Sequence, residues 1–190
     1  VRAYPEHFVA ALTARSPGGA GTAGVLWKAA AASCTAASKD SASLGRLIEC
    51  LPQKPPFLFV HGLSEVKAGV SAAGSVTFPT GHPVFENHLP GNPIVPGVIL
   101  IEALAQLSGI VLIPSDRPEP IQGYLGEVRR VRFRRKVRPM ERVELSTRLL
   151  QRYAGAASFA VEARVDGQVA VEGEIAVGGG SVVSGGPSPA

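Results

Sequence analysis

The sequence predicts an α+β fold in which an antiparallel sheet wraps around one buried helix. Three observations lead to this prediction: a long apolar helical segment, strand-like segments on both sides of it, and a strong hairpin signal between the last two strands. The 190 residues suffice for one domain with a core, and a hydrophobic content of 45% excludes wholesale disorder. We predict a single folded domain at residues 44–177.

The elements before the central helix are short. Residues 44–52 offer a short helix that Pro52 ends. Two apolar runs, at 55–66 and 70–79, have strand character, and Pro79 closes the second. We therefore expect one helix and two strands in this part of the chain.

The central helix is expected at residues 96–113. Proline is tolerated at a helix start, and the segment is apolar on nearly every side, as in a helix that is buried all round. This helix should supply the core on which the strands pack.

Alternating apolar and polar residues predict four further strands, at 127–139, 142–153, 157–167 and 168–178. Asp166 and Gly167 join the last two, and this dipeptide is a strong signal for a two-residue hairpin. Such connections indicate an antiparallel sheet.

The two ends of the chain differ from the middle in composition. Residues 1–43 are rich in alanine, glycine and serine, and 178–190 have linker composition, so we expect a poorly ordered extension and a flexible tail.

No stretch reaches the roughly 18 uninterrupted apolar residues of a membrane span. Cys34 and Cys50 are too few for a disulfide scaffold and fit a reducing compartment. We expect a cytoplasmic protein that binds no membrane; a transit peptide at 1–43, where acidic residues are scarce, would instead direct it to a plastid-type organelle.

One carboxylate interrupts the apolar helix. Glu102 lies among leucine, isoleucine and alanine, so partial desolvation should raise its pKa, and Gln106 lies one turn further on the same face. His88 precedes a proline-rich turn that leads into the same helix. We predict that His88 and Glu102 form an acid–base pair. The alternative is that Glu102 is a buried structural acid that meets an arginine.

The start of the helix offers a third part of a catalytic site. Gly97 and Val98 lie where amide groups lack intrahelical partners and the helix dipole favours negative charge. Gly97 also allows a ligand to approach the backbone closely. A thioester carbonyl could accept hydrogen bonds from these amides, as in an oxyanion hole.

These residues belong to a longer pattern. The segment HLPGNPIVPGVILIEALAQ, at 88–106, resembles the active-site segment of the bacterial 3-hydroxyacyl-acyl-carrier-protein dehydratases of the hot-dog fold. Segments at 55–60, 131–139 and 163–175 are also similar to that family. The resemblance covers roughly residues 44–177.

The resemblance implies a long helix wrapped by an antiparallel sheet, and a homodimer with its active sites at the subunit interface; a larger oligomer stays open. It implies loss of water from a (3R)-3-hydroxyacyl thioester on acyl carrier protein, giving the trans-2-enoyl product in fatty-acid or polyketide-type chain elongation. His88 matches the family's catalytic histidine and Glu102 its catalytic acid, the two coming from opposite subunits. Gly97 matches the glycine whose amide binds the thioester carbonyl.

The sequence departs from the family pattern at several positions. Asn87 and Leu89 stand on either side of His88 where the family usually has Gly and Phe, and we expect them to reshape the pocket beside the base. Other departures lie outside the catalytic motif. This chain has Gln53-Lys54 where the family usually has His-Arg, and it has His61 and Arg129 at two positions where an aspartate is common. We expect these to affect substrate choice and subunit contacts more than the type of reaction.

A possible metal pattern precedes the helix. His82, Glu86 and His88 form His-x3-Glu-x-His, but Pro83 breaks helical geometry within it and no further ligand is evident nearby. We expect neither a metal nor a cofactor.

A basic segment lies within the strand expected at 127–139. Alternation places Val131, Phe133 and Val137 on the core face. The other face carries five cations: Arg130, Arg132, Arg134, Lys136 and Arg138. Nucleic-acid binding is disfavoured because interleaved exposed aromatics for stacking are missing, and a merely solvated strand edge is the plain alternative.

The preferred partner of this basic segment is an acidic acyl carrier protein with its phosphopantetheine-linked substrate. The predicted docking residues are Arg130, Arg132, Arg134 and Lys136. Tyr124 joins Gly97 and Val98 as a predicted substrate-binding residue.

Two other functions stay open. A thioesterase of the same fold generally places an acid on the helix without the His-x-Pro-Gly loop, so His88 favours dehydration. A non-catalytic acyl-binding module would bind the substrate without turnover.

Overall fold

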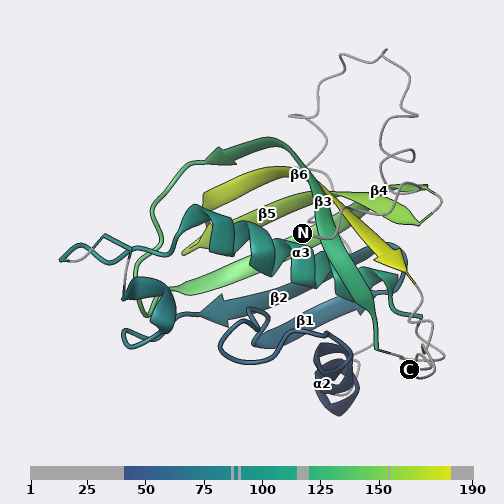
Figure 1. Cartoon of the computed structure of the whole chain (residues 1–190), viewed down its shortest axis with the longest axis horizontal. Coiled ribbons are helices and arrows are strands. Elements are labelled where there is room, and N and C mark those ends of the chain that lie inside the picture. The colour runs from purple at the N-terminus through teal and green to yellow at the C-terminus, as the bar shows by residue number, and fades with distance from the viewer. Residues whose placement is uncertain (1–40, 87, 90, 115–119, 154, 181–190) are drawn as a thin grey trace, which may run out of the picture.

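The computed structural model describes residues 41–86, 88–89, 91–114, 120–153 and 155–180. Within these ranges, one antiparallel sheet curves around helix α3, with strand order β1-β2-β4-β5-β6-β3 (Figure 1). The predicted α+β architecture is confirmed. The elements are α2 (Ser41–Glu49), β1 (Gly62–Lys67), β2 (Ser71–Thr77), the 3-10 helix η2 (Pro83–Phe85), α3 (Gly97–Leu112), β3 (Gln122–Phe133), β4 (Arg142–Tyr153), β5 (Ala156–Val165) and β6 (Gln168–Gly180).

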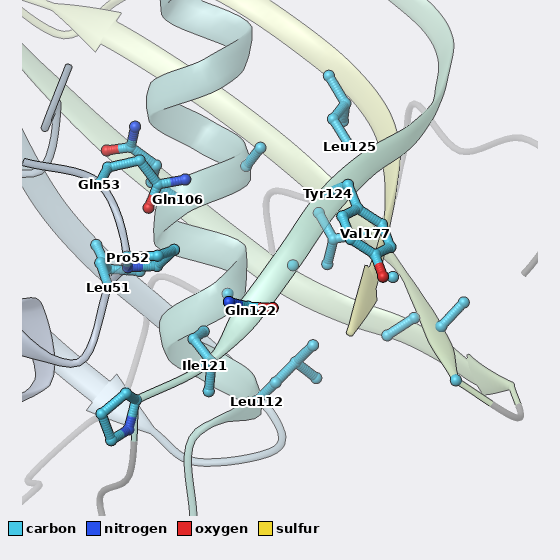
Figure 2. Close-up of a pocket in the computed structure, with 18 of the residues that line it drawn as sticks. Leu51, Pro52, Gln53, Gln106, Leu112, Ile121, Gln122, Tyr124, Leu125 and Val177 are labelled. Carbon is cyan, nitrogen blue, oxygen red and sulfur yellow. The ribbon is translucent and has the colours of Figure 1, made fainter. Parts of the chain in front are cut away.

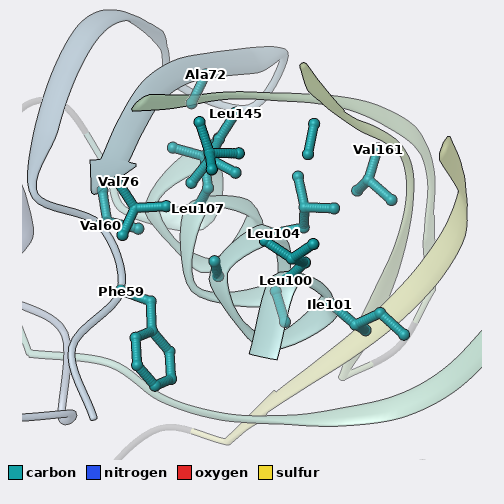
Figure 3. Packing of buried hydrophobic residues seen from close by; sticks show 14 of the residues in the cluster. Phe59, Val60, Ala72, Val76, Leu100, Ile101, Leu104, Leu107, Leu145 and Val161 are labelled. Atoms are coloured by element: carbon teal, nitrogen blue, oxygen red, sulfur yellow. The ribbon is translucent and has the colours of Figure 1, made fainter. Parts of the chain in front are cut away.

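Helix α3 is the centre of the core. It spans 97–112, within one residue of the predicted 96–113 at each end. Leu100, Leu104 and Leu107 are at most 2% exposed, and full burial of such a side chain stabilises the fold by about 2 kcal/mol. Figure 3 shows them packed with Leu145 of β4 and Val161 of β5. The uniformly apolar sequence of the helix is therefore explained by sheet on several sides of it.

The segment before β1 is not the strand that its apolar sequence predicts. The predicted strand at 55–66 begins only at Gly62. Pro55 and Pro56 have no amide hydrogen to give to a strand ladder, and the Phe59 amide instead donates to the side chain of Gln106 at 2.8 Å. Phe59 and Val60 are fully buried. The apolar run is thus a buried loop, which the pattern alone does not distinguish from a strand.

The hairpin between β5 and β6 forms as predicted. Asp166 has φ 50° and Gly167 has φ 74°, and positive φ at both central residues is the mark of a type I′ turn. This turn sets the antiparallel pairing of Val165 with Gln168.

Strand β3 departs from the simple alternation expected of the basic segment. Its pairing with β6 shifts register between Leu125 and Glu127 and again between Arg129 and Arg132, and the strand ends at Phe133. Phe133 is 54% exposed, so the prediction that it faces the core was wrong. Its ring lies over the first residue of α3, on the edge strand of the sheet.

The folded region extends slightly beyond the predicted domain bounds. Helix α2 begins three residues before position 44, and β6 continues three residues past position 177. Most of the predicted extension and tail lies outside the described residues, as do Cys34 and Asn87. In the part of the chain that the structure describes, no helix is long and apolar enough to cross a lipid bilayer.

Two glycines should respond oppositely to alanine. Gly167 has φ 74°, and an L-residue in this left-handed region costs about 1–2 kcal/mol, so Gly167→Ala should lower the free energy of unfolding by roughly that amount. Gly45 is exposed within α2 with nothing within 4 Å of an added Cβ, so Gly45→Ala should raise it by about 0.5–1 kcal/mol. Urea unfolding of both variants measures the two changes. A change of the same sign in both would contradict this account of the turn.

Candidate functional site

A cavity of about 1110 Å³ lies beside α3 (Figure 2). The helix lines it with residues spaced three or four apart, which share one face: Glu102, Ala105, Gln106, Gly109 and Leu112. The remaining walls come from the loop after α2, residues 114, 120 and 121 between α3 and β3, the start of β3, the β4–β5 hairpin and the end of β6. Among the lining residues, Glu102 is the carboxylate and Arg152 the cation.

Glu102 is held in this cavity by two side-chain amides. Its Oε1 accepts a hydrogen bond from Nε2 of Gln106 at 2.9 Å and one from Nε2 of Gln53 at 3.5 Å. Burial raises the pKa of Glu102, while the two amide hydrogen bonds act in the opposite direction. Burial is the larger influence, so the neutral form persists to higher pH than in an exposed glutamate. None of the ion pairs among the described residues involves Glu102, which disfavours the structural alternative of an acid paired with arginine.

Gln106 does more than share the face of Glu102. Its Nε2 also donates to the Phe57 carbonyl at 2.9 Å, and its Oε1 accepts from the Phe59 amide at 2.8 Å. The side chain is buried, with 3% exposed. Gln106 therefore fastens the loop before β1 to the helix and fixes the amide that contacts the acid.

Gln53 is the site residue that the sequence analysis missed. In sequence Gln53 is a departure from the family pattern outside the catalytic motif, but its amide reaches the Glu102 carboxyl. Its Oε1 is buried without a hydrogen-bond donor among the described residues. The available signal was its position directly after Pro52, where the family pattern has a histidine, yet the sequence does not show that this loop meets the helix.

His88 lies in the loop between η2 and α3 and is half-buried. Its Nδ1 lies 3.3 Å from the Ile94 carbonyl. A carbonyl only accepts hydrogen bonds, so this contact requires a proton on Nδ1 and leaves Nε2 with the lone pair of a base. His88 is not among the residues that line the cavity with Glu102. The chain therefore does not bring the predicted acid–base pair together in one cavity.

Gly97 and Val98 form the first turn of α3, as predicted. Pro96 precedes them and offers no side-chain cap, and the Ile99 amide donates to the Pro96 carbonyl at 2.9 Å, so it is the Gly97 and Val98 amides that lack an acceptor within the helix. A Cβ on Gly97 would lie 2.6 Å from the Phe133 ring. The group that approaches the Gly97 backbone closely is therefore the Phe133 ring. Val98 is 70% exposed, and neither residue lines the cavity of Glu102.

Tyr124 does line the cavity, opposite the helix. It belongs to β3, is 39% exposed and lies beside Val177 of β6 (Figure 2). Of the predicted site residues, Glu102 and Tyr124 thus share one cavity.

The two histidines of the His-x3-Glu-x-His pattern have separate surroundings. His82 caps η2, where its Nδ1 accepts a hydrogen bond from the Val84 amide at 3.2 Å. The centroids of the His82 and Phe78 rings lie 5.5 Å apart, and the two rings are nearly perpendicular. His88 contacts Ile94 instead. No group of three or more potential ligands suited to a metal ion occurs among the described residues.

The predicted docking residues are all exposed, but two of them have acidic partners on β6. Arg130 pairs with Glu174 at 3.1 Å and Arg134 with Glu172 at 2.6 Å. Arg132 and Lys136 have no such partner within the described ranges. Of the four predicted docking residues, these two therefore carry the uncompensated charge.

Comparison with solved structures places the fold. The chain aligns with a structure titled the dehydratase heterocomplex ApeI:P, from Xenorhabdus doucetiae, with a TM-score of 0.62 and 19% identity over 72% of this chain and 91% of that one. It also aligns with Cj0977, a sigma28-regulated virulence protein from Campylobacter jejuni, with a TM-score of 0.57 and 12% identity, covering 75% and 93% of the two chains. At these identities the likeness concerns the fold, and the predicted hot-dog fold is confirmed.

Comparison with curated sequences places the family. The 3-hydroxyacyl-acyl-carrier-protein dehydratase FabZ of Polynucleobacter necessarius is 33% identical over 67% of this chain and 85% of its own length. The FabZ dehydratase of Clostridium acetobutylicum is 35% identical over 68% and 92%. A family model described as a FabA-like domain matches residues 51–174, a range that holds α3, the His88 loop and Glu102. The chain belongs to the family of FabA-like domains.

Proposed function

We propose that the chain removes water from (3R)-3-hydroxyacyl thioesters on acyl carrier protein to give trans-2-enoyl thioesters, in fatty-acid or polyketide-type chain elongation. The observation that carries the proposal is the Glu102 carboxyl, held by amides in a cavity where burial raises its pKa. The names of the relatives, 3-hydroxyacyl-acyl-carrier-protein dehydratases, support the reaction and the carrier.

Glu102 acts as the acid in this proposal. Both amides donate to Oε1, so the proton of the neutral carboxyl resides on Oε2. A neutral carboxyl can give this proton to the hydroxyl on C3 as the C3–O bond breaks, and water leaves. A raised pKa keeps the acid in the form that the step needs.

His88 acts as the base. With its Nδ1 proton directed to Ile94, Nε2 can take the proton from C2, and the electrons of that C–H bond form the C2–C3 double bond. Amide donors at the start of α3 would stabilise the negative charge that develops on the thioester oxygen. Transfer of the proton from His88 back to Glu102 through solvent restores both groups.

A homodimer would complete the site. His88 lies outside the cavity of its own chain, so His88 of the partner subunit is the candidate base for Glu102. Two features support association: β3 is an edge strand of 12 residues, and Val98 and Phe133 at the helix start are 70% and 54% exposed. Exposed apolar side chains of this size mark a surface suited to a protein partner.

The basic segment would dock the carrier protein. Arg132 and Lys136 are exposed and unpaired within the described ranges, so they can meet acidic side chains of a carrier without first losing an internal partner. Arg130 and Arg134 would have to exchange the carboxylates of β6 for those of the carrier.

We place this activity in the cytoplasm. Cys50 is buried, its thiol donates to the Arg46 carbonyl at 3.3 Å, and burial raises its pKa. These are properties of an unreactive thiol, which fits a reducing compartment.

Replacement of Glu102 or His88 should lower kcat strongly without unfolding the protein. Glu102→Gln retains shape and hydrogen bonding but has no proton to give, so kcat should fall about a hundredfold or more, the usual size of general acid catalysis. His88→Ala should cause a loss of similar size, and the double variant little more, because both groups serve one elimination. Enoyl product from the parent, measured by mass spectrometry, separates dehydration from thioester hydrolysis.

Mixing the two inactive variants provides the control for a shared site. Heterodimers of Glu102→Gln and His88→Ala would contain one complete site of two and should regain activity. Activity close to the parent in Glu102→Gln alone would leave the carboxyl a structural role and overturn the mechanism.

The raised pKa of Glu102 should also make the free energy of unfolding depend on pH. A raised carboxyl pKa gives stability that is present below the ordinary value of 4.5 and is lost as pH rises through the raised value. Glu102→Gln does not titrate, so its stability relative to the parent should increase between about pH 5 and about pH 8. Urea unfolding at the two pH values measures this change. A difference that does not vary with pH would show that the carboxyl titrates normally.

Reversing the two unpaired cations should weaken carrier docking selectively. Arg132→Glu with Lys136→Glu should raise KM for a carrier-bound substrate strongly and KM for a small thioester analogue little, because only the carrier presents an acidic surface. Arg148→Glu, an exposed position on β4, is the matched control and should change neither. Equal effects on both substrates, or an equal effect of the control, would refute docking at the basic segment.

A further inference from the structure

The cavity that holds Glu102 extends along α3 toward the end of the helix. Glu102 lies in its second turn and Leu112 is its last residue, and both line the cavity. The rise of about 1.5 Å per residue separates these two positions by about 15 Å along the axis. The cavity is therefore elongated, with the acid toward one end.

The walls between these ends are mostly apolar. Ala105 and Gly109 form the helix side, and Figure 2 shows Ile121, Leu125 and Val177 around it. Further apolar lining comes from Leu51, Ala156 and Ala157. Such walls suit a hydrocarbon chain extended along the helix.

The far end of the cavity carries a guanidinium. Nη2 of Arg152 lies 3.3 Å from the position of a Cβ on Gly69. The Gly69 amide in turn donates to the Val111 carbonyl at 2.7 Å, which places the guanidinium beside the last turn of α3. Nine residues separate Val111 from Glu102, or about 14 Å along the helix.

Arg152 has no carboxylate partner among the described residues, as is also the case for Arg132, Arg142 and Arg148 of the sheet. Arg129, Arg130, Arg134, Arg135 and Arg164 all form ion pairs. Within the described ranges no acidic side chain pairs with Arg152, and the cavity lining at its end of the helix contains no other charged group. The cation is thus available to a ligand that occupies the cavity.

We propose that Arg152 binds a carboxylate at the far end of the acyl chain, so that the cavity favours 3-hydroxyacyl thioesters with an ω-carboxylate. This inference rests on the proposed function, since Glu102 fixes where C3 lies. An extended chain advances about 1.2 Å per bond, so about 14 Å, less the roughly 3 Å of a guanidinium–carboxylate contact, corresponds to about nine bonds beyond C3. Chains of about twelve carbons fit this span.

A structural role makes a different prediction. A cation beside the last turn of a helix stabilises the helix dipole whether or not a substrate is bound. Arg152→Met would then lower stability and reduce activity toward every substrate alike. Only a role in recognition separates substrates by their terminal group.

The test compares two thioesters of equal length, 3-hydroxydodecanoyl and 11-carboxy-3-hydroxyundecanoyl, both on the carrier protein. Arg152 is exposed, and an exposed ion pair contributes at most about a fivefold factor. Arg152→Met should therefore lower kcat/KM for the ω-carboxy substrate by about threefold to fivefold and change that for the methyl-terminated one little. Arg152→Lys should retain part of the preference, and Arg148→Met, on the same strand, should retain all of it.

Binding of inert thioether analogues of both substrates, measured by calorimetry, provides a second readout that needs no turnover. A loss of the ω-carboxylate preference in Arg152→Met supports the assignment. Equal binding of the two analogues to the parent, or an equal loss for both in the variant, would overturn it. Failure of the parent to form enoyl product would refute the proposed dehydration while the binding preference still reports on Arg152.

Discussion

The geometry of the site depends on the side chain of Gln106. This side chain forms hydrogen bonds with backbone groups of the loop before β1, which have no partner in a neighbouring strand. The loop before β1 buries Phe59 completely, and a buried amide without a partner costs about 1–3 kcal/mol. Gln106 accepts from that amide and donates to the Phe57 carbonyl and to Glu102. The contact that closes the core around α3 is therefore also the contact that orients the acid, so the loop cannot move without disturbing Glu102.

The carboxyl group of Glu102 on α3 lowers the stability of the fold when it is charged, but its burial favours the neutral form that the proposed reaction needs. Burial makes the charged form of Glu102 unfavourable, and this same burial raises its pKa, so the proton is retained to higher pH than in an exposed glutamate. The fold tolerates the group because Leu100, Leu104 and Leu107 pack almost without exposure against the sheet. The apolar sequence of the helix thus has two effects: it anchors the sheet, and it provides the low-polarity surroundings that the acid needs.

Local patterns predicted the parts of the fold that local physics determines. The bounds of α3 and the Asp166–Gly167 turn follow from periodicity and from positive φ, which a short stretch of sequence reveals. Contacts between distant segments were missed: Gln53 reaches Glu102 across 49 positions, and the buried loop pairs with a helix side chain. One signal was available for the irregularity in β3. Gly173 lies inside a strand, where glycine often marks a close backbone approach, and a Cβ there would lie 2.7 Å from the Val131 backbone.

The same irregular strand brings the basic segment to the start of the helix. Phe133 packs on Gly97, and the Val95 amide donates to the Val137 carbonyl at 2.8 Å. Residues 133–137, which carry exposed cations, are thereby fastened to the loop and the first turn of α3. In the proposed function, a carrier docked on these cations would sit beside the amides that bind the thioester. In the proposed dimer the acyl chain would extend from Glu102 toward Arg152 along α3 of one subunit, while His88 of the partner subunit would supply the base, so that chemistry and chain recognition depend on both subunits.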